Sequence, residues 1–209
     1  MEILTVNSIE EIDELIEFLT VVFSEFTVIN DNTTYRKKEL MESQFKEDSS
    51  FLMYIKEDNK IVAGLFAYTS KPTNSVILHI IGVLKDYRFK KYGSKLLDEL
   101  YNRSKEKNYE RIILTSKTEN YDFYIKNSYR PVLTYVVFDK ISQEEFDKLN
   151  KYNFEQTSYN VHDYKMDDKQ KHCTRITYYV DYPKLEYLQY YNHLFENSSA
   201  SYSFERILK

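Results

Sequence analysis

The segment from residue 76 to residue 97 constrains the fold of this chain more than any other. Residues 76–83 form a near-continuous apolar run of strand length. Apolar side chains then recur at helical spacing, at Leu96, Leu97, Leu100 and Tyr101. The turn between strand and helix is basic and contains Arg88, Lys90 and Lys91. Because the first turn of a helix presents free backbone N–H groups and the positive end of the dipole, the segment predicts a site for a pyrophosphate.

Glycine placement supports this interpretation. The chain has only three glycines, and two of them, Gly82 and Gly93, bracket the turn. A glycine weakens a strand unless the backbone bulges there or another group approaches closely, so Gly82 indicates one of these two. Gly93 at the helix start lets a phosphate reach the N–H groups. The alternative is an ordinary strand, turn and helix with a solvated basic turn.

The turn resembles motif A of the GNAT superfamily of acyl-CoA N-acyltransferases. That motif reads Arg or Gln, two residues, Gly, any residue, then Gly or Ala. Arg88 takes its first position and Gly93 its last, whereas Lys91 replaces the middle glycine. The resemblance implies acetyl-CoA as cosubstrate, with its pyrophosphate held by Arg88, Phe89, Lys90, Lys91, Tyr92, Gly93 and Ser94.

The resemblance covers residues 1 to about 138. Residues 51–55, 60–68 and 111–115 look like further strands of the family, and residues 120–131 are similar to its Phe-Tyr-x-x-x-x-Phe signature. Residues 131–138 read as another strand. Strands that alternate with helices predict an α/β (α+β) fold, and the resemblance makes it a mixed, mostly antiparallel twisted sheet flanked by helices.

In this superfamily two central strands splay apart, and the free backbone of one bonds the pantetheine arm of coenzyme A. The resemblance assigns this role to residues 81–84, namely Ile81, Gly82, Val83 and Leu84, with Gly82 as a bulge. It also places Asn120 in the cofactor site.

The implied chemistry is acyl transfer from a thioester to an amine. An alkyl amine with a pKa of ~10 must lose a proton before it attacks, and a departing thiolate, with a thiol pKa of ~8.5, benefits from a proton donor. By resemblance Tyr124 falls on the tyrosine that contacts the coenzyme A sulfur, so it is the candidate donor. The alternative is that Tyr124 is a core aromatic of a short helix.

His79 is the candidate base, because it lies four residues before Val83 on the apolar strand. Arylalkylamine N-acetyltransferases, of the same superfamily, place a catalytic histidine at the matching offset. A neutral imidazole there would relay the amine proton to water, although a structural histidine fits equally well. The superfamily shapes its acceptor site from the link between the first two helices, which gives as substrate contacts Phe26, Asn30, Asp31 and Tyr35.

The two helices before that link have their own signals. Ser8 and Glu11 form a capping-box pattern ahead of an apolar stripe, and Thr33 or Thr34 would cap the second helix. We expect residues 1–138 to form the acetyl-CoA-binding core. Residues 139–209 would add a strand-helix-strand extension, with helices at 143–149 and after Pro183, and strands at 174–180 and 200–208. The many tyrosines of the extension suit a homodimer interface or acceptor pocket, or simply complete the core.

Composition excludes several function classes. The chain has 29 basic and 33 acidic residues, a formal charge of −4, which argues against nucleic acid or a membrane surface as partner. No apolar run is long enough to span a bilayer, so we expect a cytoplasmic protein. The single cysteine, Cys173, adjoins His172, but no further ligand lies at metal spacing and we expect no metal. We therefore predict an acetyl-CoA-dependent N-acetyltransferase, with a noncatalytic acyl-CoA-binding module as the alternative.

Overall fold

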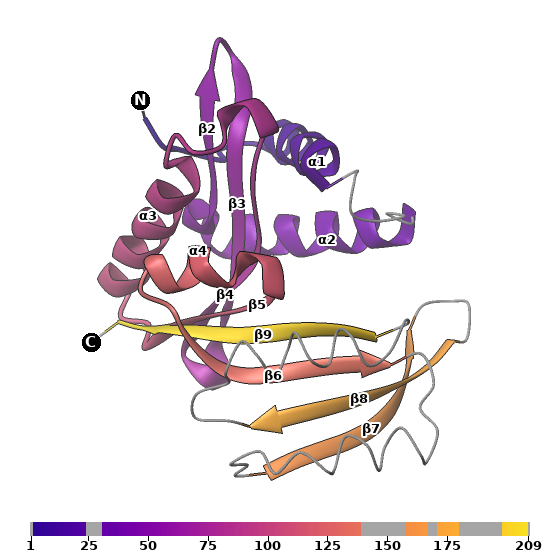
Figure 1. Ribbon diagram of the computed structural model, residues 1–209. Helices are drawn as coiled ribbons and strands as arrows, with labels where there is room; N and C mark the ends of the chain where they lie inside the picture. The colour runs from indigo at the N-terminus through magenta and orange to yellow at the C-terminus, as the bar shows by residue number, and fades with distance from the viewer. Residues whose placement is uncertain (1, 24–30, 139–157, 167–170, 180–197, 209) are drawn as a thin grey trace. The chain divides into compact units, whose positions relative to one another are not determined.

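The computed structural model covers the whole chain and describes all residues except 1, 24–30, 139–157, 167–170, 180–197 and 209 (Figure 1). Its helices are α1 (Ile9–Phe23), α2 (Asp31–Asp48), α3 (Tyr92–Glu106) and α4 (Tyr121–Lys126). Its strands are β1 (Leu4–Thr5), β2 (Leu52–Glu57), β3 (Lys60–Ser70), β4 (Ser75–Val83), β5 (Arg111–Lys117), β6 (Arg130–Phe138), β7 (Ser158–Met166), β8 (Lys171–Tyr179) and β9 (Ser198–Ile207). The chain forms two compact units, residues 1–113 with 207–209, and residues 114–206.

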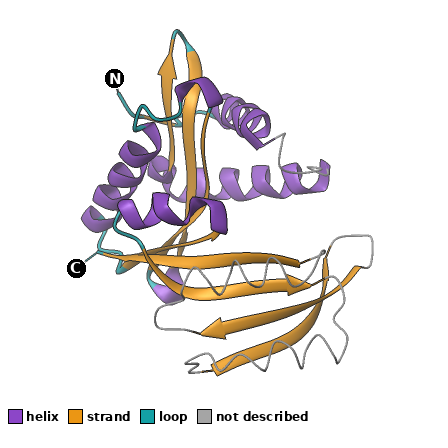
Figure 2. Ribbon diagram, in the orientation of Figure 1, coloured by secondary structure: helices purple, strands orange, loops and turns teal. Residues whose placement is uncertain are grey.

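The first unit is a sheet flanked by helices. Its strands lie in the order β1-β2-β3-β4-β5. Neighbouring strands are antiparallel, except that β4 and β5 run parallel. Helices α1 and α2 cover one face of this sheet and α3 covers the other (Figures 1 and 2). The expected mixed, mostly antiparallel sheet with flanking helices is confirmed.

Helix α1 begins where the capping pattern predicts. The Ser8 hydroxyl accepts a hydrogen bond from the Glu11 N–H at 3.3 Å, and the Glu11 carboxylate accepts one from the Asn7 N–H at 2.9 Å. These bonds satisfy donors that the helix itself leaves free. Helix α2 begins at Asp31, so the prediction that Thr33 or Thr34 caps it is wrong, because both lie inside its first turn.

Two glycines allow α1 to lie close to the sheet. Gly64 on β3 pairs with Gly82 on β4. A Cβ atom added to Gly64 would lie 2.7 Å from Leu15 Cδ1, and one added to Gly82 would lie 2.9 Å from Val22 Cγ1. Both distances are too short for carbon atoms, so a side chain at either position would force its neighbour on α1 to move.

The register of β4 shows where its bulge lies. Pairing with β3 runs without a break through Gly82, and it shifts between Phe66 and Ala67, where His79 is the extra residue on β4. The prediction of a bulge at Gly82 is therefore wrong. Gly82 is explained by the close approach of α1, which is the other reason for a glycine inside a strand.

The second unit contains α4 and the later strands. Its sheet has the order β9-β6-β8-β7, and every neighbouring pair is antiparallel. The Ser203 hydroxyl on β9 donates to the carbonyl of Leu114, the first residue of this unit, at 3.2 Å. Strands β8 and β9 match the predicted strands at 174–180 and 200–208, whereas β7 was not predicted. The helices expected at 143–149 and after Pro183 lie outside the described residues.

Candidate functional site

The turn before α3 presents backbone donors. Lys91 is the residue that precedes the helix, and its side chain makes no capping hydrogen bond. The first hydrogen bond of the helix runs from the Lys95 N–H to the Lys91 carbonyl at 3.0 Å. The N–H groups of Tyr92, Gly93 and Ser94 come before that bond and have no acceptor within the helix. They lie at the positive end of the α3 dipole, which favours an anion.

The backbone at Lys91 explains how the chain departs from the motif. Lys91 has φ 64° and ψ 16°, the left-handed conformation that glycine adopts without steric cost. The family motif has its middle glycine at this position. At the position of the motif glycine, Lys91 therefore has a backbone conformation that a glycine would adopt without strain, and its side chain is exposed.

Cationic side chains surround these donors. Arg88, Lys90 and Lys91 are all exposed. The Arg88 Nε donates to the Val83 carbonyl at 3.4 Å, which holds the guanidinium beside the end of β4. The Lys90 Nζ lies 4.6 Å from the ring centroid of Tyr87. Backbone donors and exposed cations in one turn are the groups that a pyrophosphate requires, so the residues present fit that ligand.

Strand β4 is paired with β3 over a much longer stretch than with β5. Its pairs with β3 extend to Val83, and the Leu84 N–H then donates to the Val62 carbonyl at 3.0 Å. Its pairs with β5 cover only Ser75, Val76 and Ile77. Residues 81–84, the predicted anchors of the pantetheine arm, lie beyond the last of those pairs.

His79 lies at the bulge of β4 and is exposed. A bulge redirects a side chain, and here the imidazole lies among aromatic rings. Ring centroids are 5.6 Å apart for His79 and Phe66, and 6.0 Å apart for His79 and Tyr68. Tyr68 was not predicted from the sequence, because only the register shift at the bulge brings it beside His79.

Tyr124 belongs to the second unit and is 6% exposed. Its ring centroid lies 5.1 Å from that of Phe123, 5.8 Å from Tyr129 and 5.2 Å from Phe204. Burial raises the pKa of Tyr124 to about 12, and a hydrogen bond with the Ser116 hydroxyl acts in the opposite direction. The phenol is therefore protonated at neutral pH, as a proton donor must be.

Asn120, which precedes α4, is exposed, and its amide Nδ2 donates to the Ser116 Oγ at 3.1 Å. Ser116 on β5 thus contacts two of the predicted site residues. Ser116 was missed because its only sequence signal is a hydroxyl on an alternating strand.

Comparison with known proteins identifies the family. The model of the acetyltransferase (GNAT) family matches residues 12–127. This chain belongs to the GNAT acetyltransferase family. The resemblance seen in the sequence is confirmed, and membership implies acyl-CoA-dependent acetyl transfer.

Several solved structures share the fold. An acetyltransferase of the GNAT family from Staphylococcus aureus Mu50 aligns over 100% of this chain and 99% of its own, with 20% identity and a TM-score of 0.56. PH1933 from Pyrococcus horikoshii OT3 covers 86% of this chain and 98% of its own, with 16% identity and a TM-score of 0.51. IAA acetyltransferase from Bacillus cereus ATCC 14579 covers 86% of this chain and 99% of its own, with 11% identity and a TM-score of 0.50. Comparison with curated proteins gave no match.

Some predicted residues of this GNAT chain have no described side chain. Phe26 and Asn30 lie outside the described residues, and Asp31 and Tyr35 lie in α2. His172 and Cys173 lie on β8. Among the side chains that the structure describes, no three metal-ligating groups come together. No helix in the described ranges is both long and apolar enough for a membrane crossing.

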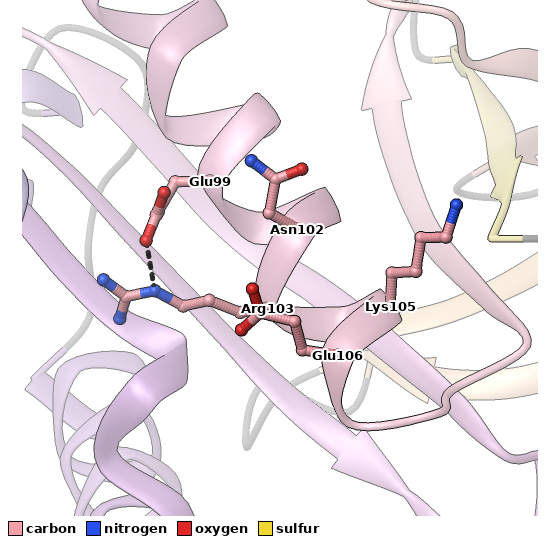
Figure 3. A pocket seen from close by; sticks show the side chains of 5 residues that line it. All are labelled: Glu99, Asn102, Arg103, Lys105 and Glu106. Atoms are coloured by element: carbon pink, nitrogen blue, oxygen red, sulfur yellow. Dashed lines mark hydrogen bonds and ion pairs between the residues drawn. The ribbon is translucent and has the colours of Figure 1, made fainter.

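A pocket of about 380 Å³ lies on α3 of this GNAT chain, away from the turn (Figure 3). It is lined by Glu99, Asn102, Arg103, Lys105 and Glu106. The Arg103 guanidinium already bonds Glu99, the Thr5 hydroxyl and the Ser50 carbonyl, each at 2.7 Å. Its cation therefore ties α3 to the start of the chain and to the residues before β2. This pocket contains none of the predicted site residues.

Proposed function

We propose that this chain is an acetyl-CoA-dependent N-acetyltransferase. It transfers the acetyl group to a primary amine by direct attack in a ternary complex, without a covalent intermediate. The observation that carries the proposal is the turn before α3, where free N–H groups, a left-handed residue at the motif glycine and three exposed cations lie together.

The cosubstrate binds along β4 and the turn. The N–H groups of Gly93 and Ser94 donate to the pyrophosphate, and Arg88, Lys90 and Lys91 balance its charge. The pantetheine arm bonds the backbone of residues 81–84 in the manner of an added strand. The resemblance to the family also gives Asn120 a role in binding the cosubstrate.

Two side chains move protons in this proposal. His79 takes the proton of the attacking amine and relays it to solvent, which its exposed position allows. Tyr124 donates a proton to the departing thiolate, and Ser116 stabilises the phenolate that forms.

The acceptor is a small-molecule or peptide amine in a cytoplasmic setting. Phe26, Asn30, Asp31 and Tyr35 supply contacts to it, since they lie in or beside the link between α1 and α2. Residues 139–209 supply part of a homodimer interface or of the acceptor pocket.

Calorimetry with acetyl-CoA tests the binding site. Gly93→Glu sets a negative charge against the phosphates and blocks the backbone, so we expect it to abolish binding. Because Gly93 is buried, Lys91→Glu at an exposed position repeats the test without crowding. Asn102→Glu adds the same charge near the other end of α3 and should bind normally. Wild-type affinity in folded Gly93→Glu and Lys91→Glu variants would contradict the proposed site.

Release of free thiol with a panel of amines tests catalysis. We expect turnover that depends on both acetyl-CoA and the amine. Tight binding without thiol release for any amine would instead support a noncatalytic acyl-CoA-binding module. A wild-type chain that does not bind acetyl-CoA would contradict both functions.

A further inference from the structure

Glu57, at the end of β2, contacts the turn before α3 with both carboxylate oxygens. Its Oε1 accepts a hydrogen bond from the hydroxyl of Tyr92, the first residue of α3. Its Oε2 lies 3.9 Å from the ammonium of Lys90. A single carboxylate thus connects the β2–β3 hairpin to the residues on both sides of Lys91.

The hairpin that carries Glu57 has a defined geometry. Asp58 and Asn59 join β2 to β3, with φ of 47° and 61° respectively. Two successive residues of positive φ form the tight turn whose twist matches antiparallel strands. Glu57 pairs directly with Lys60 across this turn, so the central sheet fixes the backbone position from which its carboxylate extends.

The turn before α3 has a strained backbone, which neighbouring residues must hold in place. Phe89 and Lys91 both have left-handed backbones, with φ of 66° and 64°, and neither is a glycine or an asparagine. That conformation is costly for a residue with a long or bulky side chain. Phe89 is fully exposed, so packing does not compensate for its conformation. Tyr92, by contrast, is 7% exposed, and its hydroxyl donates to Glu57. These contacts hold the residue directly before Gly93 and Ser94, whose N–H groups are free.

Electrostatics alone would disfavour a carboxylate at this place. A negative charge beside a phosphate site weakens phosphate binding and competes for Lys90. The presence of Glu57 is explained if its main effect is to hold Tyr92 in place. The hydrogen bond to Glu57 also raises the pKa of the Tyr92 phenol, which keeps the hydroxyl a donor.

We propose that Glu57 is a positioning residue of the acyl-CoA site, which holds the first turn of α3 through Tyr92 in the conformation that receives the pyrophosphate. This inference rests on the proposed function. Glu57 does not touch the cosubstrate. It acts through Tyr92, while Lys90 exchanges the carboxylate for the phosphate when the ligand binds.

Calorimetric titration of CoA into the full chain tests this assignment. Tyr92→Phe and Glu57→Ala each remove the bond, and each should weaken CoA binding by about tenfold, the effect of one charge-assisted hydrogen bond. The double variant should bind no more weakly than the weaker single variant, because both changes delete one interaction. Glu57→Gln should bind CoA within about threefold of wild type. The amide oxygen of the new glutamine still accepts from the Tyr92 hydroxyl, and the loss of charge leaves Lys90 without its ion pair and free for the phosphate.

Matched controls separate position from charge. Glu47→Ala also removes a carboxylate from a lysine pair, with Lys71 at 2.7 Å, but Lys71 follows the opposite end of β3. Tyr109→Phe also removes one hydroxyl, from a residue just beyond the far end of α3. Both should bind CoA with wild-type affinity. In steady-state assays, Tyr92→Phe should raise the KM for acetyl-CoA and leave kcat within about twofold, which a general loss of folding would not do.

The outcomes are distinct. Wild-type affinity in Tyr92→Phe and Glu57→Ala, or losses that multiply in the double variant, would overturn the assignment of Glu57 alone. A wild-type chain that does not bind CoA would overturn the proposed function and this assignment together. If Glu57→Ala does not fold, the comparison of Tyr92→Phe with Glu57→Gln carries the same test.

Discussion

Tyr124→Phe is the sharpest test of the proposed chemistry, because it keeps the ring and removes only the hydroxyl. The ring of Tyr124 packs among Phe123, Tyr129 and Phe204, and the substitution preserves all of these contacts. The variant loses one buried hydrogen bond with Ser116, worth about 1 kcal/mol of folding free energy. Ser116 keeps its bond from Asn120. The variant should therefore remain folded.

The expected loss of rate follows from the environment of the phenol. General acids contribute roughly 10²–10⁴ in rate. Burial raises the pKa of Tyr124 to about 12, well above the ordinary thiol value of ~8.5, so complete transfer of its proton to a free thiolate is unfavourable. The phenol helps mainly while charge develops on the sulfur. We therefore expect the lower end of the range, a fall in kcat of about 10²-fold, with little change in the KM for acetyl-CoA.

The assay is thiol release at saturating acetyl-CoA with the best acceptor amine. Tyr202→Phe is the matched control, since Tyr202 is fully buried and, like Tyr124, packs against the ring of Phe204. Within the described residues its hydroxyl has no hydrogen-bond partner, so its removal should not lower stability. Tyr202→Phe should keep wild-type kcat. An undiminished kcat in Tyr124→Phe would refute the role of Tyr124 and make it a packing residue.

Three further predictions concern the sheet and the turn. Lys91→Gly relieves a left-handed backbone, so it should raise stability by about 1 kcal/mol in thermal unfolding, and an unchanged Tm would contradict the strain at φ 64°. Gly82→Ala places a Cβ atom 2.9 Å from Val22 Cγ1 and should lower stability by about 1–3 kcal/mol in urea. A wild-type urea midpoint would show that α1 moves away without cost. Burial, and then the charge of Glu11, raise the pKa of Tyr54 to about 12. Because the ordinary pKa of tyrosine is ~10, the protonated phenol stabilises the folded state fully below pH ~10, and this contribution is lost as the pH rises toward 12. Tyr54→Phe should therefore reduce the loss of stability measured above pH 10, and an equal loss in both proteins would contradict this.

Local patterns predicted most of the first unit. The apolar run at 76–83 and the helix after it appear as β4 and α3, because each depends on side-chain periodicity within a few turns or strand positions. The cap of α1 was predicted for the same reason, since Ser8 and Glu11 are three residues apart. The backbone conformation of Lys91 was likewise predictable from a local pattern. The spacing of the motif identified the glycine position, and the backbone there has the conformation that a glycine would take.

Contacts between residues distant in sequence could not be predicted. The bond between Glu57 and Tyr92 joins positions 35 apart, and neither residue has a neighbour that signals the other. The bulge at His79 depends on the register of β3 against β4, which a single strand does not encode. The sequence marks Gly82 as a special position, but it cannot decide whether the backbone bulges, as the resemblance implies, or another group approaches. The structure shows that Val22 and Phe23 of α1 pack against Gly82, so the close approach of another group is the reason for this glycine.

The distribution of left-handed residues links the fold to the proposed site. Among the residues that the structure describes, Asp58, Asn59, Asn74 and Asn108 adopt positive φ in ordinary turns, where short polar side chains tolerate it. Phe89 and Lys91 do so with large side chains, two positions apart, in the turn that leads into the free N–H groups. Strained backbone persists where the surrounding structure holds it in place. Glu57 and Tyr92 supply that support here. The residues that distort the turn and those that hold it therefore meet at the proposed pyrophosphate site, although Glu57 lies 35 positions before Tyr92 in the sequence.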